Sequence, residues 1–225
     1  MKGHQFLLSE VGVKPRIGWH IDPFGHSNAN ARLFAEMGFD AIFFARADFQ
    51  DAKKRMNESS MEWLWRPFFN HLGKRGQILA HLMIDNTYYP PRYFGFDDTN
   101  PNEGPFVNDT TLSTFNADWK SAFFIDYVTN MSKSFRTNHL MVPMGGDFRF
   151  INAHLNFKNM DRMIDYINTN YPNVTLMYST PGMYVDALYA ANVSWPTKYD
   201  DLFPYADHPE DYWTGYFSSR PGAKW

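Results

Sequence analysis

Residues 16–45 read RIGWHIDPFGHSNANARLFAEMGFDAIFFA, and this stretch decides the fold class. Residues 16–21 form a short apolar run that is typical of a buried strand. Residues 28–37 carry apolar side chains at helical spacing, and Gly38 is well placed to end that helix. Residues 41–45 are a second buried strand. A strand, a helix and another strand in this order predict a parallel sheet with helices on its faces.

The rest of the chain continues this alternation. Apolar runs predict strands at residues 77–84, 139–143 and 174–179, and amphipathic patterns predict helices over residues 119–135, 157–171 and 181–190. Residues 61–69 (MEWLWRPFF) are aromatic and fit neither period. Residues 85–109 have no periodicity, which predicts a long loop of the kind that often carries function. We therefore expect one α/β domain, or part of one, over residues 1–225.

Composition excludes several classes of partner. The formal net charge of -3 offers no basic face for nucleic acid. No apolar run is long enough to span a membrane, and the first residues lack the pattern of a signal peptide. The absence of cysteine excludes disulfides and thiolate metal ligands. Aromatic residues make up 18% of the chain, which suits either a sugar-binding cleft or a core of large side chains.

The chain also carries sequons for N-glycosylation. Five Asn-x-Ser/Thr sequences occur, at Asn57, Asn108, Asn130, Asn173 and Asn192. Chance would produce fewer in a chain of this composition, so the excess weakly favours a route through the secretory pathway.

Two acidic residues follow predicted strands. Asp22 comes after residues 16–21, and Asp147 comes after residues 139–143 and a Gly145-Gly146 pair. Because ligands bind beyond the carboxyl ends of parallel strands, we expect both carboxylates at the same edge of the sheet. A retaining glycosidase uses such a pair, about 5–5.5 Å apart, as nucleophile and acid/base. Each Asp alone could equally cap a helix or close a turn.

Six ordered segments resemble one enzyme family. They are WHIDPFGHS (19–27), NANARLFAEMGFDAIFFARADFQD (28–51), RMNESSMEWLWRP (55–67), NTYYPPRY (86–93), VPMGGDFRFINA (142–153) and YWTGYFSSRP (212–221). Together they resemble the zinc-dependent α-mannosidases of glycoside hydrolase family 38, in their lysosomal branch. The resemblance runs from about Lys14 to Pro221. It implies that the chain is an interior part of a seven-stranded (β/α) barrel-like catalytic domain.

The resemblance implies roles for both acidic residues. Asp22 matches the family's catalytic nucleophile, which is also a zinc ligand, and Asp147 matches its general acid/base. A carboxylate bound to a metal stays ionised, as a nucleophile must. Gly145 and Gly146 would let the chain turn tightly and bring its backbone near the ligand.

Three further residues match positions that contact the sugar in this family. Phe24 matches a residue that packs against the sugar, and Arg46 matches an arginine that lines the substrate site. Tyr88 matches a tyrosine that reaches the active-site sugar, although Tyr89 would serve if the alignment slips by one residue. Without the resemblance, Arg46 would be interpreted as an ordinary cation at the end of a strand.

The expected zinc site is incomplete. The family binds Zn²⁺ through four protein ligands, which include an upstream His-x-Asp pair and a downstream histidine. Neither segment occurs here, so Asp22 is the single expected ligand that remains. His20 and His26 lie close by in sequence, but the resemblance favours a packing or supporting role for them. We therefore expect this chain alone to bind zinc weakly and to have little or no activity.

The function implied for the parent protein is hydrolysis of terminal α-linked mannose from N-glycan oligosaccharides, with retention of configuration. The implied location is the lysosome, the vacuole or the lumen of the secretory pathway. Two alternatives remain open. One is a non-catalytic sugar-binding fragment that keeps the aromatic cleft without the metal, and the other is a Golgi-type processing α-mannosidase.

Overall fold

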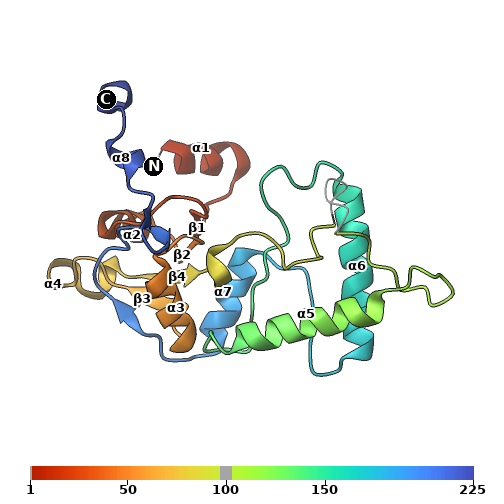
Figure 1. The fold of residues 1–225 in the computed structure, drawn as a ribbon. Coiled ribbons are helices and arrows are strands. Elements are labelled where there is room, and N and C mark those ends of the chain that lie inside the picture. Colours follow the sequence, from red (N-terminus) through yellow and green to blue (C-terminus); the bar gives the residue numbers. More distant parts are fainter. Residues whose placement is uncertain (1, 97–102) are drawn as a thin grey trace. The chain divides into compact units, whose positions relative to one another are not determined.

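A computed structural model describes residues 2–96 and 103–225 (Figure 1). The chain divides into two compact units. The first unit contains Met1–Thr87, Lys133–His139 and Pro181–Trp225, and the second contains Tyr88–Ser132 and Leu140–Thr180.

The first unit is built on a five-stranded sheet. Its strands are β1 (Ile17–Trp19), β2 (Ala41–Phe44), β4 (Ile78–Leu82), β3 (Glu62–Trp65) and β5 (Thr197–Lys198), in that spatial order. β1, β2 and β4 are parallel, whereas β3 runs antiparallel to β4. Every residue of β2 and β4 is buried, as continuous apolar strands covered on both faces require. The expected α/β class and the mostly parallel sheet are confirmed.

Helices of the first unit begin and end where the sequence predicts. α2 (Asn28–Glu36) starts at Ser27, whose Oγ accepts a hydrogen bond from the Asn30 backbone at 3.1 Å. Gly38 follows this helix with φ of 81°, a conformation that glycine adopts without strain. α7 (Pro181–Ala190) has proline at its first position. The unit also contains these elements: α1 (Lys2–Val11), α3 (Phe49–Asn57), α4 (Phe69–Leu72), η1 (Gly73–Gly76), η2 (Ile84–Asn86), β6 (Ala206–His208), β7 (Asp211–Tyr212), α8 (Gly215–Ser218) and α9 (Pro221–Lys224).

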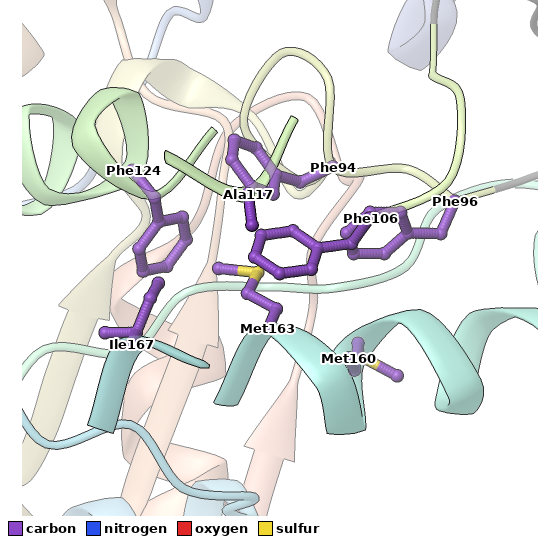
Figure 2. Packing of buried hydrophobic residues seen from close by; sticks show 8 residues of the cluster. All are labelled: Phe94, Phe96, Phe106, Ala117, Phe124, Met160, Met163 and Ile167. Atoms are coloured by element: carbon purple, nitrogen blue, oxygen red, sulfur yellow. The ribbon is translucent and has the colours of Figure 1, made fainter. Parts of the chain in front are cut away.

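The second unit packs two helices against irregular chain. α5 (Ala117–Ser132) and α6 (Ala153–Asn170) correspond to two of the predicted helices. The core of this unit consists of eight buried residues, which Figure 2 labels: Phe94, Phe96, Phe106, Ala117, Phe124, Met160, Met163 and Ile167. Two buried asparagines of α6 hold the preceding loop. Asn159 Oδ1 accepts from the Phe106 backbone at 2.7 Å, and Asn156 Nδ2 donates to the Gly95 carbonyl at 3.0 Å.

Two predicted strands are absent. In the described part of the second unit, neither residues 140–143 nor residues 174–179 pair with another strand. Their apolar side chains instead pack on the core between α5 and α6, with Val142, Val174 and Leu176 partly buried there. The apolar pattern therefore reflects packing on helices. Asp147 consequently follows an irregular segment and not a strand end, contrary to the expectation.

The unassigned residues 61–69 contain β3. Trp63 and Trp65 are fully buried in this strand, which is why the segment shows no alternation of polar and apolar positions. The expected long loop of residues 85–109 is irregular in its described portion beyond η2, and its residues 97–102 lie outside the described residues. Within residues 2–96 and 103–225, no helix has the length and apolar character needed to cross a bilayer.

Candidate active site

Asp22 and Arg46 meet at the carboxyl ends of neighbouring strands. Asp22 lies in the loop after β1, and Arg46 lies just after β2, which pairs with β1 in parallel. Arg46 Nε donates a hydrogen bond to Asp22 Oδ1, and Arg46 Nη1 donates to the Tyr205 hydroxyl at 3.3 Å. Burial lowers the pKa of Arg46, but the hydrogen bonds to Tyr205 and Asp22 more than offset this and raise it overall. The guanidinium therefore stays charged beside the Asp22 carboxylate.

Aromatic rings surround this ion pair. The Phe24 ring lies 4.9 Å from Trp213 and 6.3 Å from Tyr205 between centroids. The Arg46 guanidinium carbon lies 5.3–5.9 Å from the centroids of these three rings, within cation–π range. Tyr216 adds a fourth ring, 4.7 Å from Phe24. The structure therefore brings Asp22, Phe24 and Arg46 together, as the resemblance implied.

Tyr205 and Trp213 are members of this site that the sequence did not identify. Tyr205 is 1% exposed, and Trp213 Nε1 donates to Asp207 Oδ1 at 2.9 Å. Both lie far from Asp22 in the sequence, and nothing in local periodicity links them to it. The YWTGYFSSRP segment, quoted for its resemblance, contained Trp213 without assigning it a role.

His20 and His26 pack among aromatic side chains. The His26 ring centroid lies 4.4 Å from that of Phe44, and the His20 centroid lies 4.9 Å from that of Phe34. Burial, together with repulsion from His20, lowers the pKa of His26 from 6.5 to about 4. A neutral, buried imidazole fits the packing role that the sequence favoured.

Tyr88 and Asp147 meet in the second unit. The Tyr88 hydroxyl donates to Asp147, with distances of 3.2 Å to Oδ2 and 3.4 Å to Oδ1. Tyr88 is 6% exposed, so its ring is fixed while Asp147 faces solvent. The Tyr89 ring stacks on Tyr88 at 5.0 Å between centroids. Tyr88 therefore contacts the carboxylate directly.

The loop that carries Asp147 depends on a glycine. A Cβ added to Gly146 would lie 2.4 Å from the Tyr89 ring, closer than real Cβ contacts allow. Phe148 and Phe150 on this loop have φ of 58° and 62°, which costs energy in a residue other than glycine.

Asp22 belongs to the first unit and Asp147 to the second, and the expected spacing of a retaining pair stays a prediction.

The described residues do not by themselves fit a zinc site at Asp22. Its Oδ1 already accepts a hydrogen bond from Arg46. In residues 2–96 and 103–225, the one group of three potential ligands is Asp207, His208 and Asp211, whose ligand atoms lie within 4.8 Å of one another. That group lies on the β6–β7 hairpin and does not include Asp22. A zinc ion at Asp22 would need ligands that these residues do not supply.

Comparisons with known proteins agree with the sequence motifs. Residues 1–208 match the family described as "Glycosyl hydrolases family 38 N-terminal domain". The chain is 41% identical over 224 residues to a lysosomal alpha-mannosidase of Dictyostelium discoideum, and 45% identical over 223 residues to alpha-mannosidase At3g26720 of Arabidopsis thaliana. It is 42% identical over 227 residues to the lysosomal alpha-mannosidase of Homo sapiens. Each alignment covers 99% of this chain but 22% of the relative.

A solved structure shares the fold. The crystal structure of an alpha-mannosidase from Enterococcus faecalis V583 matches with a TM-score of 0.59 and 15% sequence identity. The match covers 88% of this chain and 19% of that protein. At this identity the likeness concerns the fold alone.

Proposed function

The chain belongs to glycosyl hydrolase family 38, and on that premise we propose that a protein containing it, here called the complete enzyme, hydrolyses terminal α-linked mannose in N-glycan oligosaccharides with retention of configuration. The observation that carries this proposal is the Asp22–Arg46 ion pair, which lies within a group of aromatic rings. Because the chain spans 22% of these relatives, the activity is proposed for the complete enzyme.

Asp22 acts as the nucleophile in this proposal. Its carboxylate attacks the anomeric carbon and forms a glycosyl–enzyme ester, while Asp147 donates a proton to the leaving oxygen. Asp147 then takes a proton from water, which attacks the ester and releases mannose. Support for Asp22 comes from Arg46, whose hydrogen bond to Oδ1 holds the carboxylate in one orientation. The Tyr88 hydrogen bond would hold Asp147 in one orientation.

The aromatic rings would bind the sugar. Phe24 and Trp213 offer flat apolar faces beside Asp22, suited to the C–H face of a pyranose. Arg46 provides N–H donors for sugar hydroxyl oxygens once Asp22 and Tyr205 have fixed its position. Tyr88 would contact the sugar from beside Asp147.

We also propose a metal ion, a domain form and a cellular location for the complete enzyme. We propose that Asp22 is one ligand of a zinc ion, which would hold substrate hydroxyls, and that other ligands come from a part of the complete enzyme outside this chain. The two units would belong to one catalytic domain of (β/α) barrel-like form. Lysosomal relatives at about this identity support a lysosomal or secretory location, in preference to Golgi processing.

The stereochemistry of the product tests the proposal. The complete enzyme would be mixed with an α-mannoside, and the first mannose released would be followed by proton NMR before it mutarotates. We expect α-mannose, because two displacements at the anomeric carbon retain configuration. β-Mannose as the first product would exclude a covalent role for Asp22.

A second candidate is sugar binding without hydrolysis by this chain alone. The group of Phe24, Tyr205 and Trp213 around Arg46 favours it, because its contacts need no metal. Tryptophan fluorescence during titration with methyl α-mannoside would test this, with Trp213→Phe as the comparison. A saturable change that disappears in Trp213→Phe supports binding, and no change in either protein excludes it.

A further inference from the structure

The loop that carries Asp147 forms an ion pair with a distant segment of the second unit. Arg149, two residues after Asp147, donates from Nη1 to Glu103 Oε2 at 2.9 Å. The two side chains are 18% and 14% exposed, so water and salt screen this pair less than an exposed one. The backbone next to Asp147 is thereby attached to the segment around Glu103.

The position of the Glu103 carboxylate is fixed by the backbone beneath it. A Cβ added to Gly95 would overlap Glu103 Oε2, so the carboxylate lies directly against this glycine. Gly95 itself stands between Phe94 and Phe96, two residues of the buried core (Figure 2). Its carbonyl accepts a hydrogen bond from the buried Asn156 side chain of α6 at 3.0 Å. Glu103 therefore lies on backbone that is held from both the core and a helix.

A buried lysine holds the chain next to Glu103. Lys120 of α5 donates from Nζ to the Gly104 carbonyl at 2.6 Å and to the Tyr93 carbonyl at 3.1 Å. Burial lowers the pKa of this ammonium group to about 8, and the charge of Glu103 acts in the opposite direction. The segment that presents Glu103 to Arg149 is thus attached to α5 as well as to α6.

The Asp147 loop is strained and needs such attachments. Phe148 and Phe150, on either side of Arg149, have positive φ, a conformation that persists only where the surroundings hold it. Tyr88 restrains the carboxylate of Asp147 through its hydroxyl. The ion pair of Arg149 restrains the backbone of the same loop.

We propose that Glu103 is a positioning residue for Asp147 and acts through Arg149. The inference rests on the acid/base role proposed above for Asp147. A general acid must lie within hydrogen-bond reach of the leaving oxygen, and a misplacement of about 1 Å is costly. Loss of Glu103 should therefore weaken proton donation to the leaving group more than any other part of the reaction.

The test compares two substrates of the complete enzyme that differ in their need for a proton. An α-linked mannobiose has a basic leaving oxygen, whereas dinitrophenyl α-mannoside has an acidic one and forms the glycosyl–enzyme without a general acid. Glu103→Ala should lower kcat/KM for mannobiose by about 10-fold, part of the roughly 10²–10⁴-fold that a general acid contributes, and should spare the dinitrophenyl substrate. Loss of folded enzyme would lower both values equally, so the ratio of the two values separates positioning from a merely structural role.

Three variants calibrate this ratio. Asp147→Ala should change it in the same direction and by a larger factor. Glu36→Ala should leave it unchanged, because Glu36 pairs with Arg32 on the surface of α2. Glu103→Gln keeps the size of the side chain but loses its charge, so it should change the ratio less than alanine does. If Glu103→Ala does not fold, Glu103→Gln decides the question.

The route through Arg149 has its own measurement. Glu103→Ala combined with Arg149→Ala should change the ratio no further than Arg149→Ala alone, because the two residues act as one unit. Losses that multiply would overturn this route. An unchanged ratio in both Glu103 variants, with a changed ratio in Asp147→Ala, would overturn the positioning role and leave the proposed function intact. An unchanged ratio in Asp147→Ala would overturn the acid/base assignment and the inference with it.

Discussion

Arg46 binds Asp22 through Nε and the Tyr205 hydroxyl through Nη1, so one guanidinium joins the carboxylate to a buried ring. The Asp22 side chain is 48% exposed and that of Arg46 is 21% exposed. An ion pair with one partner so exposed contributes little to folding stability. Its value therefore lies in fixing the orientation of Asp22 at the carboxyl end of β1.

Arg46→Lys should lower kcat/KM of the complete enzyme for α-mannosides by about 10²-fold, the usual cost of removing a positioned donor. Lysine keeps the charge but cannot reach Asp22 and Tyr205 through one planar group. Steady-state kinetics measure the effect. Arg32→Lys is the matched control, because Arg32 pairs with Glu36 on the surface of α2. Equal kinetics for the two variants would argue against the role of Arg46.

Gly146→Ala should destabilise the chain by about 1–3 kcal/mol, the usual cost of overpacking. The added methyl would meet the Tyr89 ring at 2.4 Å, so either the ring or the Asp147 loop must move. Gly145→Ala is the control, since its Cβ would lie an ordinary 3.6 Å from Phe150. Urea denaturation of the two variants measures the difference. Equal free energies of unfolding would show that the loop accommodates the added methyl group without loss of stability.

The sequence predicted those parts of the fold that local patterns determine. The strands at residues 16–21, 41–45 and 77–84 and the helix that starts after Ser27 follow from apolar periodicity and end signals. Residues 174–179 show the limit of this reasoning. An apolar run indicates that side chains are buried, but it does not show whether the backbone pairs with another strand. Here the run packs on helices.

Some residues of the candidate site could also be predicted from local patterns, and others could not. Asp22 and Arg46 were predictable because neighbouring parallel strands place their following loops together. Tyr205 and Trp213 were not, because their contact with Phe24 depends on how the C-terminal segment folds back. The Tyr88–Asp147 contact likewise joins two irregular segments that have no period.

His26 should make folding less favourable in acid. Its pKa is about 4 in the folded chain because of burial and the nearby His20, against an ordinary 6.5. Between these values the unfolded chain binds the proton and the folded chain does not, so stability falls as pH drops from 6.5 towards about 4. The full loss is about 3 kcal/mol.

Urea denaturation at about pH 7 and about pH 5 measures this loss through the change in unfolding free energy. In His26→Leu the change between the two pH values should be smaller than in the unsubstituted chain. The readout is the difference between the unfolding free energies at the two pH values. Packing against Phe44 that is lost in the variant affects both free energies and cancels in this difference. His139→Gln, at an exposed histidine, should behave like the unsubstituted chain. An unchanged pH dependence in His26→Leu would contradict the assignment.

Zinc should bind the chain alone only weakly. Three or four ligands hold zinc tightly, and the described residues offer no such set that includes Asp22. Calorimetric titration should show at most weak binding, which His208→Ala removes and Asp22→Ala leaves unchanged. Tight one-to-one binding that Asp22→Ala abolishes would bring His20 or His26 into the metal site.

Asp22 and Asp147 should respond differently to azide in the complete enzyme. Asp22→Ala removes the nucleophile and should abolish turnover of every substrate. Asp147→Ala should depend on the leaving group, because protonation matters most when the leaving oxygen is basic, as in an oligosaccharide. An aryl mannoside with an acidic leaving group needs no such proton, so the glycosyl–enzyme should still form and accumulate.

Azide attacks the glycosyl–enzyme without a general base, so it should partly restore turnover of the aryl mannoside by Asp147→Ala and yield an α-mannosyl azide. Asp22→Ala should stay inactive, because it cannot form the intermediate that azide attacks. NMR of the azide product identifies its configuration. If azide instead gave an α-mannosyl azide with Asp22→Ala and a β-mannosyl azide with Asp147→Ala, the two carboxylates would have to exchange roles, because the α product identifies the variant that still forms the glycosyl–enzyme.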